Sequence, residues 1–199
     1  MYSFKSPSSE ELAHDFLWRT NRCLPPRGKI GIFNRSYYEE VLVVRVHPEL
    51  LEKQRIPDAL CGNHFWRNRY GDISALEHYL TRNGIAIRKF FLNVSKKEQK
   101  KRFLQRLETK EKNWKFSPDD VKERKHWNEY QDAYEKMIRH TATEDAPWVI
   151  VPADNKWFTR LLVVAVIVDA LNSLDLQYPK LTPAQVAALK QARKQLERA

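Results

Sequence analysis

The sequence is poor in cysteine and has no long apolar run. Only Cys23 and Cys61 occur in 199 residues, with no C-x-x-C pair and no histidine cluster at metal-ligand spacing, so neither a disulfide scaffold nor a zinc site is expected. The longest apolar run, Leu161 to Val168, is far shorter than the roughly 20 residues that span a membrane. The first residues lack an apolar signal core, and we therefore expect a soluble, cytoplasmic protein with no membrane contact.

Acidic residues are too few to balance the basic ones. The chain holds 35 Lys and Arg against 25 Asp and Glu, a net charge of +10 at pH 7. Such an excess attracts anions at long range, among them polyphosphate, nucleotides, nucleic acid or an anionic membrane surface. The charge is concentrated between Lys96 and Lys125, where twelve basic and six acidic residues give a net of +6. The sequence also lacks a G-x-x-x-x-G-K-[ST] stretch, which is the usual glycine-rich phosphate cradle.

Short apolar runs alternate with helical patterns along a chain of single-domain size. This alternation predicts an α/β fold in which helices flank a mostly parallel sheet. Strands are expected at 2–4, 29–33, 87–94 and 148–151. Helices are expected at 73–82, 95–110 and 117–138, with a terminal helix from Thr182.

Several of these helices begin with capping residues. Ser8, Ser36 and Ser95 each precede a Glu by three positions, a spacing that satisfies free amide groups of the first turn. Asp154 is expected to cap the helix that follows the last strand. The junctions between strands and helices are therefore well marked.

Polar residues gather after the expected strand 29–33. Asn34, Arg35, Tyr38, Glu39 and Glu40 follow its carboxyl end, the edge at which open α/β sheets bind ligands. A carboxylate there can hold Mg²⁺ and an arginine can neutralise phosphate oxygens. An equally good interpretation is that Ser36 and Glu39 only cap a helix while Arg35 and Glu40 are solvated.

The basic segment predicts a mobile flap. Lys110, Lys112 and Lys115 flank a helix break and could close on phosphates, although an ordinary solvated face is the favoured interpretation for any one of them. In a continuous helix 117–138, Arg124 would lie beside the aromatic side chains and Lys125 nearly opposite. Trp127, Tyr130 and Tyr134 of this helix could stack on a nucleobase, but their helical spacing favours packing in the core.

Two further features leave alternatives open. Arg19 could contact an anion or form a surface ion pair. Residues 63–70 mix aromatic and basic side chains as nucleic-acid surfaces do, but the stretch is too short to decide. The six histidines are expected to be structural or exposed rather than metal-bound.

Several separated segments resemble the family-2 polyphosphate kinases. They are 6–19, 24–39, the Trp127-x-x-Tyr130-x-x-Ala133 pattern, and 146–156 followed by Arg160. The similarity covers roughly Tyr2 to Leu174. It implies a P-loop kinase fold and Mg²⁺-dependent phosphoryl transfer between polyphosphate and AMP or ADP, with ATP among the nucleotides. We also expect a homo-oligomer.

The resemblance assigns roles to the polar residues. It places a Walker B motif at 33–36 and a lid near 110–126, with Asn34 where many members have Asp. The expected catalytic residues are Asn34, Arg35, Glu39 and Arg124, and the expected metal ligands are Asn34, Glu39 and Glu40. Lys110, Lys112 and Lys115 would bind polyphosphate, and Arg19 and Tyr38 would bind the nucleotide.

The departure from the family is the missing Walker A loop. Members carry a first strand and glycine-rich loop upstream of the position of Tyr2, and that strand lies centrally in the order 2-3-1-4-5. We therefore expect residues 1–174 to be a partial P-loop kinase domain, followed by a helical extension at 175–199. A truncated chain would fold poorly and have reduced activity or none. The alternatives are an ATP-dependent kinase of thymidylate-kinase type and a non-enzymatic polyanion-binding or RNA-binding module.

Overall fold

The computed structural model describes residues 1–198, except for the side chains of Lys112 and Lys115. These residues form two units, 1–163 and 164–199. The elements are β1 (Tyr2–Ser3), α1 (Ser9–Leu12), α2 (Trp18–Asn21), β2 (Phe33–Asn34), η1 (Tyr37–Val41), α3 (Val43–Val46), η2 (Pro48–Gln54), η3 (Asp58–Leu60), α4 (Phe65–Arg82), β3 (Lys89–Asn93), α5 (Lys96–Glu108), η4 (Lys110–Lys115), α6 (Pro118–Glu123), η5 (Arg124–His126), α7 (Trp127–Thr141), β4 (Trp148–Pro152), α8 (Lys156–Ser173) and α9 (Pro183–Leu196), where η denotes a 3₁₀ helix.

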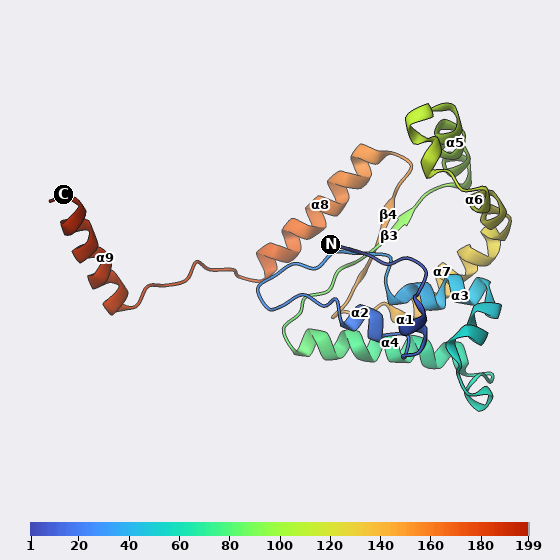
Figure 1. Ribbon diagram of the computed structural model, residues 1–199, viewed down its shortest axis with the longest axis horizontal. Helices are drawn as coiled ribbons and strands as arrows, with labels where there is room; N and C mark the ends of the chain where they lie inside the picture. The colour runs from blue at the N-terminus through green and yellow to red at the C-terminus, as the bar shows by residue number, and fades with distance from the viewer. Residues whose placement is uncertain (199) are drawn as a thin grey trace. The chain divides into compact units, whose positions relative to one another are not determined.

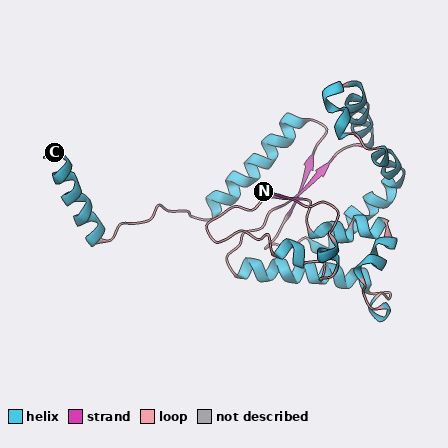
Figure 2. Ribbon diagram, viewed as in Figure 1, coloured by secondary structure: helices cyan, strands magenta, loops and turns pink. Residues whose placement is uncertain are grey.

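The strands are short and form parallel pairs, while helices supply most of the regular structure (Figure 2). β1 pairs with β2, and β3 pairs with β4 over five positions from Lys89 opposite Trp148 to Asn93 opposite Pro152. The predicted α/β architecture with parallel pairing is confirmed. A single sheet that lacks its central strand stays a prediction, because the strands within residues 1–198 form two separate pairs.

The core of the first unit lies among η1, α4 and α7, of which α4 and α7 are labelled in Figure 1. Val41 and Ile73 are wholly buried there, and Met137 is nearly so. Tyr134 and Ile138 pack against this cluster. The apolar face of the 127–138 segment therefore serves as core, as its helical spacing predicts.

A polar cluster is enclosed beside this core. The buried carboxylate of Glu77 accepts hydrogen bonds from Tyr37 (2.9 Å) and Tyr38 (2.8 Å), and from the ammonium of Lys89 (2.6 Å). Lys89 also donates to the carbonyl of Thr141 at 2.7 Å. Burial, followed by the charge of Glu77, raises the pKa of both tyrosines, while burial lowers that of Lys89 despite Glu77. The cluster is fully paired, as buried charge requires.

Two expected elements are wrong in extent. The strand at 29–33 shrinks to Phe33–Asn34, and Ile30 and Ile32 are exposed. Ile30 is 70% exposed and Ile32 53% exposed. A Cβ at Gly31 would lie 3.0 Å from the ring of Pro25, so the chain passes close to that ring. The apolar run therefore mimics a buried strand without being one.

The continuous helix 117–138 is also wrong. It divides into α6, η5 and α7, because His126 at φ −86° and ψ 25° leaves the helical region. The helix predicted from Ile73 begins earlier, at Phe65, and ends at Arg82 as expected.

The capping predictions are confirmed for Ser8 and Ser95, and only in part for Ser36. Ser8 and Glu11 form a reciprocal capping box, and Ser95 accepts from the amide of Glu98. Ser36 caps η1, but through Tyr38 rather than Glu39. Asp154 accepts from the amide of Ser95, and so joins the turn after β4 to the start of α5; its capping of α8 stays a prediction. Across residues 1–198, the helices are each too short or too polar to cross a bilayer.

Candidate active site

The turn after β2 carries the predicted Walker B residues. Asn34 ends the strand and donates from its amide to the hydroxyl of Ser3 at 3.4 Å. Arg35 follows with φ of 61°, a left-handed conformation that costs a side-chain-bearing residue on the order of 1 kcal/mol. Ser36 then caps η1. The backbone therefore reverses sharply and leaves the Arg35 side chain 63% exposed.

Arg35 and Glu39 lie together at this turn. Their charged groups are 3.9 Å apart, and Glu39 is half-buried. Burial raises the pKa of Glu39, Arg35 opposes that rise, and the charge of Glu40 adds to it. The charge of Glu39 in turn contributes to the raised pKa of Tyr130 and Tyr134, for each of which burial is the largest cause. An exposed guanidinium thus stands beside a carboxylate that is held against the core.

Glu40 faces the interior instead. One of its oxygens accepts from Arg69 at 2.7 Å and from Gln54 at 2.6 Å. The Arg69 guanidinium, itself buried, lies over the rings of Phe16 (4.4 Å) and Phe65 (4.9 Å). The structure therefore places Glu40 in a buried ion pair, apart from the open side of the turn.

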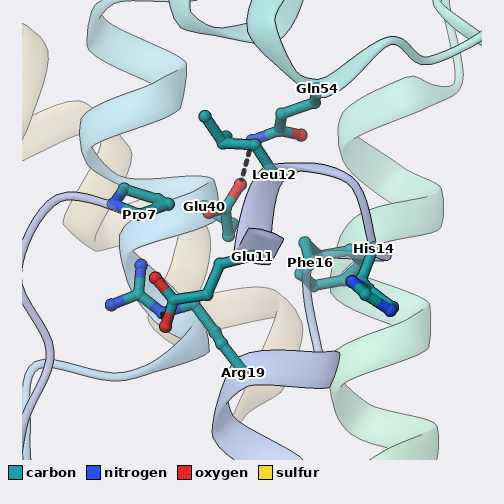
Figure 3. A pocket seen from close by; sticks show the side chains of 8 residues that line it. All are labelled: Pro7, Glu11, Leu12, His14, Phe16, Arg19, Glu40 and Gln54. Carbon is teal, nitrogen blue, oxygen red and sulfur yellow. Dashed lines mark hydrogen bonds and ion pairs between the residues drawn. The ribbon is translucent and has the colours of Figure 1, made fainter. Parts of the chain in front are cut away.

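The two residues predicted to bind nucleotide take different positions. Arg19 donates to the carbonyl of Lys5 at 2.8 Å and pairs with Glu11 at 3.5 Å, beside a cavity of about 10 Å³ that Glu40 also lines (Figure 3). That volume holds about one water molecule. Tyr38 is buried in the Glu77 cluster. Arg19 thus shows the ion pair that its sequence context allowed, and its anion contact stays a prediction.

The predicted lid corresponds to η4, α6 and η5. Lys110 is exposed in η4, and the side chains of Lys112 and Lys115 lie outside the described part of the chain. Arg124 donates to Gln99 of α5 at 2.6 Å and lies 6.0 Å from the ring of Trp127. Arg124 is therefore held against α5, and no contact within residues 1–198 joins it to Arg35.

The base of this lid is tied to the body of the unit by Glu123. Its carboxylate bonds the ring of His47 at 2.9 Å and accepts from the hydroxyl of Tyr130 at 2.8 Å. The charge of Glu39 also contributes to the raised pKa of Tyr130, so the lid base and the Arg35 turn interact electrostatically through this tyrosine. The sequence contained no pattern that linked His47 to Glu123.

A second group of cations escaped the sequence analysis. Arg102, Lys156 and Arg160 line a pocket of about 200 Å³ at the carboxyl ends of β3 and β4. The helical spacing of Lys156 and Arg160, directly after a strand, was the available pattern. Lys156 and Arg160 entered the prediction only as part of the family resemblance.

The described residues include no group of three or more His, Cys, Asp or Glu side chains placed to hold a metal ion. Among the expected magnesium ligands, Asn34 and Glu39 lie on the open turn, whereas Glu40 is engaged by Arg69. A cage built from protein ligands alone is thus not found in the part of the chain described.

Comparisons with known proteins agree on one family. The family described as polyphosphate kinase 2 matches residues 1–179. An ADP-polyphosphate phosphotransferase of Rhodopseudomonas palustris is 54% identical over 197 residues, which are 98% of this chain and 68% of that protein. An AMP/ADP-polyphosphate phosphotransferase of Meiothermus ruber is 44% identical over 89% of this chain and 62% of its own length.

A solved structure shows the same similarity in three dimensions. Polyphosphate kinase 2 from Arthrobacter aurescens TC1 superposes with a TM-score of 0.85 at 40% identity, over 96% of this chain and 64% of that one. The chain thus spans about two thirds of the length of these relatives. With a family match over most of its residues and a close structural counterpart, the chain belongs to the polyphosphate kinase 2 family.

Proposed function

We propose that the protein transfers a phosphoryl group between polyphosphate and AMP or ADP. The observation that carries the proposal is the turn after β2, where a strained and exposed Arg35 stands 3.9 Å from a half-buried Glu39. Non-glycine residues in such conformations concentrate at functional sites, where the strain positions a side chain. The substrates are those for which the relatives are named.

Arg35 is the group expected to act on phosphate. Its guanidinium presents several donors to phosphate oxygens, and its charge would stabilise the negative charge that spreads over the transferring group. Lys110 and Arg124 of the lid are expected to add positive charge when the lid closes. Phosphoryl transfer depends on positioning and charge neutralisation, so no covalent intermediate on the protein is required.

Mg²⁺ is part of the proposal, with a reduced set of ligands. Magnesium usually binds one or two carboxylates together with substrate phosphates. Asn34 and Glu39 fit that pattern, since they lie at the open turn. Glu40 fits poorly, because its oxygen already accepts from Arg69 and Gln54. When bound, the ion would neutralise phosphate charge.

The central test is a turnover assay with polyphosphate, Mg²⁺ and either AMP or ADP. The assay is carried out with the 199-residue chain and with a longer polypeptide that contains it, and it measures the formation of ATP or ADP. Arg35→Gln should lower kcat at least tenfold, while the exposed Arg82→Gln on α4 should leave it unchanged. If neither polypeptide forms product, the enzymatic proposal is wrong.

The same assay examines the alternatives. Turnover with ATP as the sole phosphoryl donor would favour the thymidylate-kinase type of activity, and salt-sensitive RNA binding without turnover would favour the polyanion-binding module. The P-loop arrangement of the full sheet, a cytoplasmic location and an assembly of identical chains remain proposals.

A further inference from the structure

The pocket at the carboxyl ends of β3 and β4 has the character of a ligand site. Its volume is about 200 Å³, and its walls combine aliphatic side chains, Leu92 and Val94, with the cations Arg102, Lys156 and Arg160. In parallel α/β structures, ligands bind outside the carboxyl ends of the strands. Two helices, α5 and α8, also begin at this edge, and their first turns add partial positive charge.

Lys156 and Arg160 have no partner to neutralise them. They are four residues apart in α8, on one face of the helix, and neither forms a hydrogen bond or ion pair with any described side chain. Like charges at this spacing destabilise a helix by a few tenths of a kcal/mol. Three other helical cations have an acidic partner at the same spacing, namely Arg102 with Glu98, Lys136 with Asp132 and Arg139 with Glu135.

The remaining groups at the pocket are already satisfied. The Arg102 guanidinium donates to the carbonyls of Ala153 (2.7 Å) and Asp154 (3.0 Å), besides its bond to Glu98. Thr159 donates to the carbonyls of Pro152 and Asn155, which fixes the first turn of α8 against β4. The pocket wall is therefore rigid, and only Lys156 and Arg160 remain to receive a ligand.

We propose that this pocket binds a segment of a phosphate chain, with Lys156 and Arg160 as its charged contacts. Charge-assisted hydrogen bonds to phosphate oxygens are strong, and an aliphatic wall strengthens them by excluding water. The lining residues include no aromatic ring on which a base could stack. The proposal deepens the proposed function and rests on it for the expected source of the chain, which is polyphosphate.

The test measures binding directly, without turnover, so it is independent of whether the protein is a kinase. A labelled polyphosphate is titrated onto the wild type, K156A/R160A and the charge-matched control K53A/R82A, whose residues are exposed on η2 and α4. The pocket variant should bind at least tenfold more weakly and with a smaller dependence on salt. The control should change much less, since it removes only long-range attraction.

Two further arms decide the interpretation. K156R/R160K keeps both charges and should retain binding, which separates lost contacts from a misfolded helix, and thermal unfolding of each variant checks the fold. ATP titrated in place of polyphosphate identifies the source of the chain. A loss of affinity for either ligand that is larger in the pocket variant than in the control variant supports a phosphate-chain site. Equal losses in the pocket and control variants for both ligands, or no loss in either, would overturn the proposal.

Discussion

The two ends of the β3–β4 pair treat positive charge in opposite ways. At the amino end Lys89 is 7% exposed, and its ammonium bonds Glu77, Tyr38 and a backbone carbonyl. At the carboxyl end Lys156 and Arg160 are exposed and have no ion pair among the described side chains. A buried cation is costly unless it is fully paired, whereas an exposed one stays hydrated at little cost. The paired end therefore stabilises the fold, and the unpaired end is available to a ligand.

The largest expected effect comes from breaking the paired end. Lys89→Met should lower the free energy of unfolding by about 3–5 kcal/mol, because it leaves Glu77 buried without its counter-charge. Urea unfolding followed by tryptophan fluorescence measures the loss.

Lys156→Met is the matched control at the open end and should shift stability by no more than about 0.5 kcal/mol. Similar losses in both variants would remove the distinction between the two ends. Adding Glu77→Gln to Lys89→Met should recover part of the stability, since a neutral amide oxygen still accepts from the two tyrosines.

The sequence predicted the two strands of this pair, but not the use of either end. Strands were expected at 87–94 and 148–151, and the structure has them at Lys89–Asn93 and Trp148–Pro152. The bond of Lys89 to Glu77 could not be predicted, because it joins a strand to the middle of α4 through tertiary packing. Nothing local distinguishes Lys89 from a surface lysine.

The same limit explains the mixed outcome at the candidate active site. β2 ends at Asn34, where the polar segment begins, and the family resemblance assigned both Glu39 and Glu40 as metal ligands. The turn to η1 points one toward Arg35 and the other toward Arg69. Which neighbour faces inward depends on the left-handed conformation of Arg35, and an arginine at that position gives no indication of it.

An intermediate effect separates these adjacent glutamates. Glu40→Gln should cost about 2 kcal/mol, because the buried Arg69 loses a charge-assisted hydrogen bond. The Mg²⁺ concentration that the Glu40→Gln variant requires for turnover should not change. Glu39→Gln should have a small effect on stability and should raise the Mg²⁺ concentration required for turnover. A raised Mg²⁺ requirement in Glu40→Gln at unchanged stability would restore Glu40 as a metal ligand.

The smallest expected effect is at His47. Its side chain is more exposed than that of Lys89 but, unlike Lys156 and Arg160, it has acidic partners among the described side chains. Its ring bonds Glu123 of α6, lies 3.3 Å from Glu49 of η2, and faces His126 and Tyr130 at ring distances of 5.1 and 6.4 Å. Partial burial lowers the pKa of His47, but the bond to Glu123 and the two negative charges outweigh it, so the net pKa is raised. The pKa of Glu123 is lowered: burial raises it, but the bonds from His47 and Tyr130 outweigh that.

These two shifts give a defined pH window for His47→Gln. A raised histidine pKa contributes stability that is present below the unfolded value, about 6.5, and is lost as the pH rises through the folded value. The contribution of Glu123 is present above its unfolded pKa of about 4.3, so both act between about pH 4.3 and 6.5. His47→Gln should therefore cost up to about 1 kcal/mol at pH 6 and less at pH 9, as measured by urea unfolding at each pH. A cost that is equal at the two pH values would mean that His47 acts by packing alone, as an uncharged ring between η2 and the lid base.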